Sequence, residues 1–344
     1  MRLTTYIIST LALLSGLKAG ATTIDTDTVM TTDTPNRTLI IPPALHEGDR
    51  IAILSPAGIA RPQNVYHALP VLQEMGWEPF LTEHALGRSG TYSGTDRERF
   101  ADLKNALLDP SVKAILCSRG GYGAVHLLEM LDSLPLRDNA KWIIGFSDIS
   151  ALHALMHKHG IASIHGPMAK HIGSYDGKDE DTRALFAILN GSPVEYHLPT
   201  HEYNRHGEAE GTLTGGNLAV LADLIGTPYD MITPGTILFI EDIAEPIYKI
   251  ERIMYQLKLR GVLAQLGGLI VGQFTDYEPD ADHPSMESMI RDMVREYDYP
   301  VAFDVPIGHV THNIPLIESA RVYMCVDSDS VTISQCEPDK TGSE

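Results

Sequence analysis

Short apolar runs alternate with amphipathic stretches from residue 50 onward. Four runs in the first half of the chain are predicted to be strands: residues 50–54, 78–81, 112–117 and 142–146. Residues 96–108, between the second and the third run, repeat apolar side chains with the helical period. This alternation is typical of a parallel sheet with crossover helices. The last two runs are almost continuously apolar, which indicates strands buried on both faces.

The pattern thins near residue 168 and restarts near residue 209, where a second α/β unit is expected. The stretches 170–181 and 201–207 are polar, so we place the domain boundary between them. The predicted fold class is α/β, with an N-terminal parallel-sheet domain and a smaller C-terminal α/β domain. The parts expected along the chain are a signal peptide at 1–21, a flexible lead-in at 22–41, the N-terminal domain at 42–170, a linker at 171–206 and the C-terminal domain at 207–344.

The first 21 residues have the features of an export signal. Arg2 supplies a positive start, residues 7–17 form a short apolar run, and small residues at 19–21 suit a signal peptidase. The apolar run is too short for a comfortable membrane span. A buried N-terminal helix is the alternative, but residues 22–38 are rich in Thr and Asp, which is typical of a flexible lead-in. We therefore predict a periplasmic or secreted protein with no membrane span once the signal is removed.

Charge and cysteine content exclude several classes of partner and site. The 344 residues carry a formal net charge of -19, so nucleic acids and anionic membrane surfaces would be repelled at most faces. The three cysteines include no CxxC spacing, which argues against a cysteine zinc site and against a disulfide framework. Cys325 and Cys336 could still pair across a hairpin.

A serine follows the predicted strand at 142–146 directly. In Gly145-Phe146-Ser147-Asp148 the chain turns from a buried strand into a helix, so backbone N–H groups and the positive helix end favour a developing oxyanion at Ser147. This is the arrangement of a nucleophile elbow, although Ile149 stands where G-x-S-x-G has its second glycine. Capping of the helix is the alternative, because Ser and Asp are preferred at helix N-termini.

A glycine-rich loop follows the predicted strand at 112–117. Residues 118–123 read Ser-Arg-Gly-Gly-Tyr-Gly, so the backbone can approach a ligand closely, and Arg119 can hold a carboxylate bidentately. Phosphate binding is an alternative, but the loop has no GK[ST] and no clean G-x-G-x-x-G. Ligands of open α/β sheets bind at the carboxyl ends of the strands, so we expect this loop and Ser147 to form opposite walls of one cleft.

The second half offers acids and histidines that could complete a site. Glu241 and Asp242 follow the apolar residues 237–240, and His309 lies between a glycine and a proline-bearing loop, where it can act as a general base. Both features are also compatible with purely structural roles. The remaining candidate is a metal site on the helix after Ser147, formed by His153, His157 and His159. We predict no metal, because no H-E-x-x-H pattern or distant acid completes that group and a solvated helix face explains it.

Four co-linear motifs together resemble the LD-carboxypeptidase family of serine peptidases. The match spans residues 42–334, and the motifs are residues 118–123, residues 145–148, residues 238–242 with Pro246, Tyr248 and Arg252, and the pair Gly308-His309. The resemblance implies murein tetrapeptide carboxypeptidases and relatives that inactivate peptide-nucleotide antibiotics of the microcin C type. It also implies a flavodoxin-like or amidotransferase-like N-terminal domain, a homodimer and no cofactor. Carried over by motif, Ser147 is the nucleophile, His309 the base and Glu241 its orienting acid.

Acyl transfer by these three residues requires further groups. The expected oxyanion donors are the backbone N–H groups of Gly121 and Asp148, and Arg119 and Tyr122 are expected to bind the murein peptide. The chain departs from the family pattern in its export signal, which favours trimming of wall peptides outside the cytoplasm, and also at Val310, Ile317 and Glu318. Two other functions remain open, an immunity peptidase of the microcin C type and a non-catalytic exported solute-binding protein. The third residue of the peptide, lysine or diaminopimelate, is also open.

Overall fold

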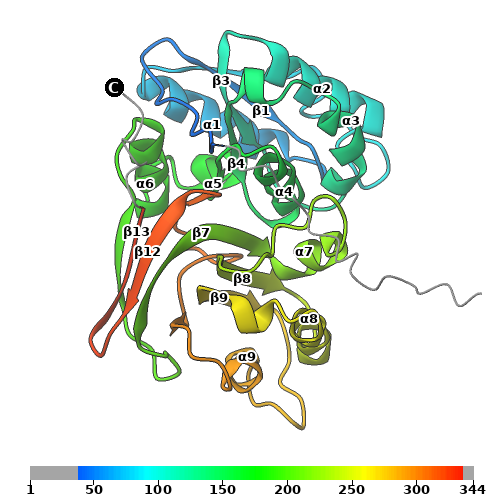
Figure 1. The fold of residues 1–344 in the computed structure, drawn as a ribbon. Helices are drawn as coiled ribbons and strands as arrows, with labels where there is room; N and C mark the ends of the chain where they lie inside the picture. Colours follow the sequence, from blue (N-terminus) through cyan, green and yellow to red (C-terminus); the bar gives the residue numbers. More distant parts are fainter. Residues whose placement is uncertain (1–37, 336–344) are drawn as a thin grey trace, which may run out of the picture. The chain divides into compact units, whose positions relative to one another are not determined.

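A six-stranded sheet carries the first part of the computed structural model, which describes residues 38–335 (Figure 1). Its strand order is β11-β5-β4-β3-β1-β2, and all neighbours are parallel except β11. The strands are β1 (Arg50–Leu54), β2 (Glu78–Leu81), β3 (Val112–Cys117), β4 (Trp142–Gly145), β5 (Ser163–His165) and β11 (Leu316–Glu318). The α/β class and the parallel sheet predicted from the apolar runs are therefore confirmed.

Helices cover both faces of this sheet, and the strand residues alternate between them. Ile51 and Ile53 of β1 pack with the helices on one face, and Ala52 and Leu54 pack with those on the other. The first face is covered by α1 (Pro62–Glu74), α5 (Ala169–Ser174) and α6 (Glu180–Leu189), and the second by α2 (Asp96–Leu108), α3 (Leu128–Asp132) and α4 (Ser150–Lys158). Since side chains of a strand alternate in direction, a strand covered on both faces must be apolar throughout.

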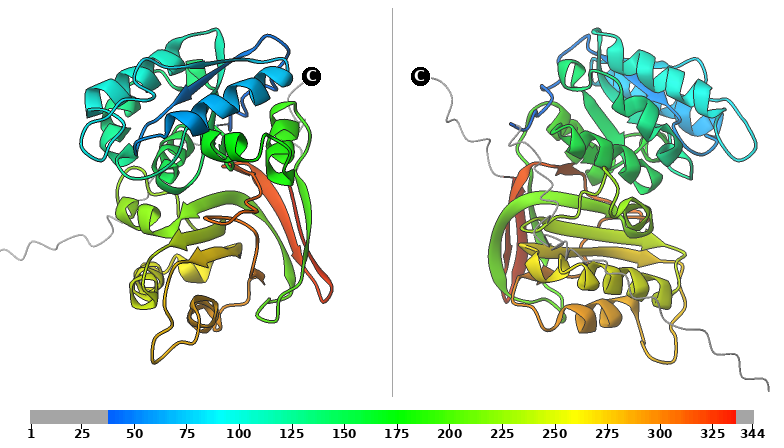
Figure 2. Two further views of the ribbon diagram at one scale, coloured as in Figure 1. Left: turned by 180° about the vertical axis from the view of Figure 1, so that it is seen from behind. Right: turned by 45° about the vertical axis from the view of Figure 1, so that its right-hand side comes forward.

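A seven-stranded mixed sheet carries the second part, in the order β10-β9-β8-β7-β12-β13-β6 (Figure 2). Strands β7 to β10 are parallel, whereas β12, β13 and β6 continue the sheet in antiparallel pairs. The strands are β6 (Glu195–Pro199), β7 (Gly207–Asn217), β8 (Ile237–Ile243), β9 (Gly268–Thr275), β10 (Val301–Ala302), β12 (Arg321–Val326) and β13 (Ser330–Gln335). Helices α7 (Leu218–Leu224), α8 (Ile247–Leu259) and α9 (Met286–Val294) pack on one face.

The chain crosses between the two sheets more than once. Residues 171–206, for which the sequence predicts a linker, contain α6, which packs on the first sheet, and β6, which pairs with β13 in the second. Later, β11 returns from the second part and pairs with β5 at the edge of the first sheet. One apolar core also continues from α2, α3 and α4 to α7, α8 and α9. These connections limit movement of the two sheets relative to each other.

Single 3₁₀ turns complete the secondary structure: Ala124–Leu127, Arg137–Asn139, Ser147–Ile149 and Leu263–Gln265. Within residues 38–335, no helix combines the length and the apolar character that a membrane span requires. The predicted signal peptide, most of the lead-in and Cys336 lie outside the described residues.

Strand β11 brings a fully buried carboxyl group into the junction of the sheets. Glu318 has no exposed surface, and its Oε1 lies 3.7 Å from Nε2 of His153, which is also fully buried. His153 is satisfied as a neutral ring, because Nε2 donates to the Gly145 carbonyl at 2.9 Å and Nδ1 lies 2.8 Å from the Ser163 hydroxyl. Burial lowers the pKa of His153 to about 4 and raises the pKa of Glu318 well above its usual range.

The buried Glu318 predicts a pH-dependent stability difference against Glu318→Gln. A raised folded-state pKa stabilises the fold below the unfolded value of about 4.3, and that stabilisation is lost as the pH rises toward the folded value. The introduced amide does not ionise in this range. The free energy of unfolding of Glu318→Gln should therefore rise relative to that of the natural protein by about 1.4 kcal/mol for each pH unit in that window. Urea unfolding at pH 5 and pH 8 measures this, with Glu208→Gln on an exposed site of β7 as the control. Equal differences at both pH values would contradict the assignment.

Candidate functional site

A strained turn presents Ser147 at the carboxyl end of β4. Ser147 has a φ of 66°, a left-handed conformation that costs a residue with a side chain about 1–3 kcal/mol. The turn can close tightly because Gly145 has no side chain: a Cβ there would lie only 2.9 Å from Cγ1 of Ile149. Ile149 itself is fully buried. The side chain that replaces the second glycine of G-x-S-x-G therefore packs inward against the first glycine, and the elbow is kept.

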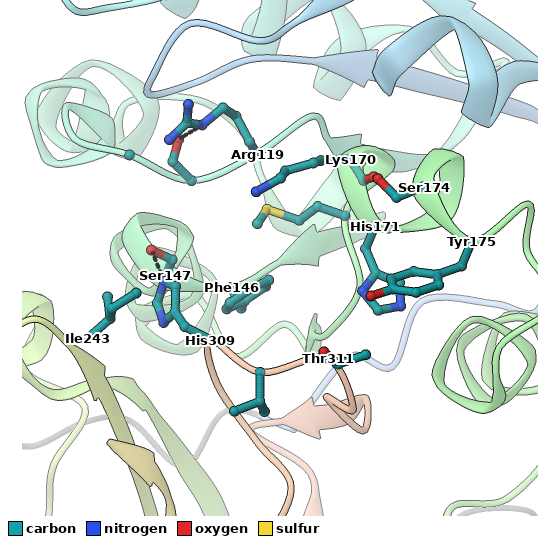
Figure 3. A pocket seen from close by; sticks show the side chains of 14 residues that line it. Arg119, Phe146, Ser147, Lys170, His171, Ser174, Tyr175, Ile243, His309 and Thr311 are labelled. Carbon is teal, nitrogen blue, oxygen red and sulfur yellow. Dashed lines mark hydrogen bonds between the residues drawn. The ribbon is translucent and has the colours of Figure 1, made fainter. Parts of the chain in front are cut away.

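Residues from both sheets meet at this turn in a line of two hydrogen bonds, of which Figure 3 draws the one between His309 and Ser147. Nδ1 of His309 donates to Oε2 of Glu241 at 2.8 Å, which leaves Nε2 to accept from the Ser147 hydroxyl at 3.0 Å. Glu241 is completely buried within β8, and its second oxygen, Oε1, has no hydrogen-bond partner among the described residues. The His309 ring also packs against Phe146, with ring centroids 5.0 Å apart. The structure thus brings together the three residues that the sequence singled out.

Two close approaches of backbone make this line possible. Gly308 has a φ of 121°, and a Cβ there would lie 2.8 Å from Oε2 of Glu241. Gly120 faces Ser147, since a Cβ on it would lie 2.8 Å from the serine Cβ and 2.9 Å from its Oγ. Gly121, the predicted oxyanion residue, packs instead against Gly58, although it also lines the cavity in front of Ser147. Gly120 is therefore the glycine of the loop whose Cα side faces the hydroxyl, while the direction of the Gly121 N–H stays a prediction.

The acids next to the candidate triad serve structural contacts. The Asp148 carboxylate accepts the backbone N–H of Ala124 at 2.8 Å, and burial raises its pKa. Asp242 accepts from Asn217 at 2.9 Å and from the backbone of Ala219 at 2.8 Å, so it secures the start of α7. Burial, and then the charge of Glu241, raise the pKa of Asp242 to about 6. The pair at 241–242 is thus buried within β8, one residue at the candidate triad and the other at a helix end.

A cavity of about 580 Å³ opens in front of Ser147 and His309. Arg119 lies on its wall as predicted, with Nε donating to the Gly120 carbonyl at 3.2 Å. Tyr122 does not line it; this side chain is 57% exposed and packs against Tyr92 and His126. The prediction that Tyr122 contacts a ligand in this cavity is therefore not supported by its position.

Another part of the cavity wall comes from α5, which the sequence did not predict. Lys170, His171, Ser174 and Tyr175 line it, as Figure 3 shows. Residues 170–181 are polar, and this polarity favoured a domain boundary in the sequence. The available signal was their position directly after the short strand β5, because loops after neighbouring parallel strands meet at one sheet edge.

The histidines of α4 do not form a solvated face, so that interpretation was wrong. His153 is fully buried, His157 lies 2.9 Å from the Ser319 hydroxyl, and His159 lies 2.7 Å from Asp132. The three rings face different partners. A different group, His171 with Asp179 and Asp181, places three potential ligand atoms within 4.8 Å of one another. Hydrogen bonds within the protein account for it, since Asp179 accepts from His171 at 3.0 Å and caps α6.

Asp181 ties the loop that carries His309 to α6. Its Oδ2 accepts the backbone N–H of Asn313 at 2.7 Å, and its Oδ1 lies 2.7 Å from Nδ1 of His312. The Asn313 side chain in turn accepts the backbone N–H of Gly308 at 2.8 Å. Asp181 and Asn313 are each only 2% exposed, and burial raises the pKa of Asp181. The Asp181 carboxylate therefore holds Asn313 directly and Gly308 only through the Asn313 side chain.

Asp181→Ala should loosen this segment. The change leaves the buried N–H of Asn313 without an acceptor, so we expect the free energy of unfolding to fall by about 1–3 kcal/mol. Hydrogen exchange at the amides of residues 308–313 should accelerate more than elsewhere. Asp181→Asn keeps an acceptor oxygen and should have the smaller effect. Exchange in 308–313 that matches the natural protein would show that the carboxylate does not hold the loop.

Comparison with known proteins identifies the family. The LD-carboxypeptidase N-terminal domain matches residues 51–166 and the LD-carboxypeptidase C-terminal domain matches residues 210–324. The probable murein peptide carboxypeptidase of Bacillus subtilis is 34% identical over 82% of this chain and 91% of its own length. The murein tetrapeptide carboxypeptidase of Pseudomonas aeruginosa is 33% identical over 77% of this chain and 89% of its own length.

Solved structures share the fold. The muramoyltetrapeptide carboxypeptidase from Oxalobacter formigenes has a TM-score of 0.77 and 27% identity, covering 84% of this chain and 99% of its own. The microcin C7 self immunity protein MccF in complex with aspartyl sulfamoyl adenosine has a TM-score of 0.76, covering 87% of this chain and 99% of its own. At 22% identity it shows the fold alone. Both domain matches and relatives a third identical over most of the chain show that this protein belongs to the LD-carboxypeptidase family of peptidases.

Proposed function

We propose that this protein is a serine carboxypeptidase that removes the terminal D-alanine from murein tetrapeptides. The observation that carries the proposal is the line from Ser147 through His309 to Glu241, with distances of 3.0 and 2.8 Å, at the wall of a cavity. A hydroxyl, an imidazole and a buried carboxylate in this order are the parts that acyl transfer requires. Relatives named as murein peptide carboxypeptidases support the choice of substrate.

The chemistry proceeds through an acyl-enzyme. Ser147 Oγ attacks the carbonyl carbon before D-alanine while Nε2 of His309 takes the hydroxyl proton, and Glu241 stabilises the imidazolium. Backbone N–H groups of Asp148 and of the glycine loop stabilise the oxyanion. When the C–N bond breaks, His309 returns the proton to the departing amine. Water then attacks the ester carbonyl carbon while His309 takes one of its protons. The bond between that carbon and Oγ breaks, His309 returns the proton to Ser147, and the shortened peptide is released as a carboxylic acid that ionises in water.

We place this reaction outside the cytoplasm, on the basis of the N-terminal sequence. Arg2, the apolar run and the small residues at 19–21 favour export, and an exported peptidase of this kind would trim wall peptides where they are made or released.

Arg119 lies on the cavity wall, and this position supports recognition of a carboxylate on the substrate.

A second candidate is the immunity peptidase that cleaves peptide-nucleotide conjugates. The structural neighbours bound to aspartyl sulfamoyl adenosine and to glutamyl sulfamoyl guanosine are consistent with it, as is Tyr175, an aromatic cavity residue that is 42% exposed. A stacked nucleobase needs such a platform. Assaying murein tetrapeptides and an aminoacyl sulfamoyl adenosine in parallel distinguishes the two.

Ser147→Ala should lower kcat on murein tetrapeptides by about four to six orders of magnitude, because the nucleophile acts as a unit with its base. The assay follows loss of one alanine mass from peptides with lysine or diaminopimelate at the third position. Ser133→Ala, an exposed serine after α3, serves as the matched control. Turnover of either peptide by Ser147→Ala at the natural rate would refute the assignment, and 1:1 binding without turnover by the natural protein would favour a solute-binding role.

Gly120→Ala should lower kcat/KM by about 100-fold, the cost of displacing a reacting group by about 1 Å. The added methyl group would lie 2.8 Å from Cβ of Ser147, so the loop or the serine must move. Gly120 does not have a positive φ, so the substitution adds no backbone strain of its own. Steady-state kinetics and the melting temperature are measured together. A variant with the natural kcat/KM would show that the loop does not set the position of the nucleophile.

A further inference from the structure

A smaller cavity of about 170 Å³ adjoins the main one. It lies between the start of α1, the end of β3 and the start of α5, where Arg61, Asn64 and Ser118 form its far side. Arg119 and Lys170 line both cavities and so form the boundary between them. In Figure 3 these two side chains lie on the same side of the main cavity. We refer to this smaller space as the side cavity.

The side cavity is cationic in a protein that is strongly acidic. Arg61, Arg119 and Lys170 line it, and no Asp or Glu lines it or the main cavity. Among residues 38–335, none of the three forms an ion pair with a carboxylate. The whole chain has 45 acidic and 26 basic residues. All three residues are exposed, so solvent partly screens their charges, and an anion that enters the side cavity meets the field of all three.

Backbone hydrogen bonds hold the Arg119 guanidinium in place and fix the backbone of Lys170 beside it. The Arg119 guanidinium donates to the carbonyls of Gly120 and Ile59 at 3.2 and 3.3 Å, which uses Nε and Nη1 and leaves Nη2 for a ligand. The backbone N–H of Lys170 donates to the Ser118 carbonyl at 3.0 Å, so α5 starts at a fixed position beside the loop. Arg61 precedes the first residue of α1. The three charges therefore come from three elements that the fold holds together.

The side cavity also has the size and the position for a small terminal residue. A water molecule takes about 30 Å³ in the liquid, so 170 Å³ holds a group several times larger but not a whole peptide. Gly120 contacts Ser147, and Ser118 is two residues away, within about 8 Å at 3.8 Å per residue. An alanine whose amide bond lies at Ser147 can therefore extend its carboxylate toward Arg119 and Lys170.

We propose that the side cavity binds the terminal carboxylate of the departing residue, with Lys170 and Arg61 completing the site that Arg119 begins. The inference rests on the proposed function and explains why cleavage is confined to the end of a peptide. The main cavity of about 580 Å³ then holds the longer acyl part, while the side cavity selects a small residue with a free carboxylate. A peptide whose last carboxyl group is an amide lacks the charge that this site recognises.

Binding to the full-length Ser147→Ala protein tests the site without turnover. The two ligands are a murein tetrapeptide ending in D-alanine and the same peptide ending in D-alaninamide, measured by isothermal titration calorimetry. We expect the acid to bind at least about tenfold more tightly than the amide, the effect of one charge-assisted hydrogen bond. Adding Lys170→Gln or Arg61→Gln should bring the ratio of the two affinities close to one.

Lys104→Gln, an exposed lysine on α2, is the matched control and should leave the ratio unchanged. A ratio that stays the same in both Lys170→Gln and Arg61→Gln overturns the site, as does equal loss of affinity for acid and amide, which would assign these residues to an internal carboxylate. Hydrolysis of the tetrapeptide is measured separately with the protein that keeps Ser147. Selective binding without hydrolysis would refute the proposed function and keep the site, whereas hydrolysis with an unaltered ratio would do the reverse.

Discussion

The hydrogen-bonded position of one imidazole between two sheets is the constraint on which the rest of the structure depends. His309 bonds to Ser147, at the end of a strand of the first sheet, and to Glu241, inside a strand of the second. Two bonds of 3.0 and 2.8 Å tolerate little relative movement of those sheets. The shared core, the return of β11 to the first sheet and the tie from Asp181 all limit such movement. The crossings of the chain between the two sheets thus help to keep the His309 ring within hydrogen-bond distance of both partners.

Glycines at the site are steric requirements of that arrangement. Gly145, Gly120 and Gly308 each have another group where a Cβ would stand, and the groups displaced would be Ile149, Ser147 and Glu241 respectively. The backbone can therefore come within contact distance of Ser147 and of Glu241, the two ends of the line. The strain at Ser147 follows from the same tight packing, because a hydroxyl exposed at a strand end requires a sharp turn.

Charge is distributed against the average of the chain. The sequence as a whole has more acidic than basic residues, whereas the charged residues that line the two adjoining cavities are arginine, lysine and histidine. The buried acids near them have other tasks: Asp148 and Asp242 accept backbone N–H groups, and Glu241 holds the imidazole. An anionic ligand that enters these cavities meets side chains of opposite charge, which favours its binding there.

The sequence by itself determined the local elements and the candidate nucleophile turn. The apolar runs at 112–117 and 142–146 predict strands because a strand buried on both faces is apolar whichever elements cover it. Ser147 is a candidate nucleophile because the chain changes from strand to helix beside it. Only tertiary structure decided what touches the site: the wall from α5, the close approach of Gly120 to Ser147, the burial of His153, and the anchoring of Asn313 by Asp181. These are contacts between residues far apart along the chain, such as the 132 positions between Asp181 and Asn313. Periodicity reports which face of an element is buried, but it carries no information on which distant element covers that face.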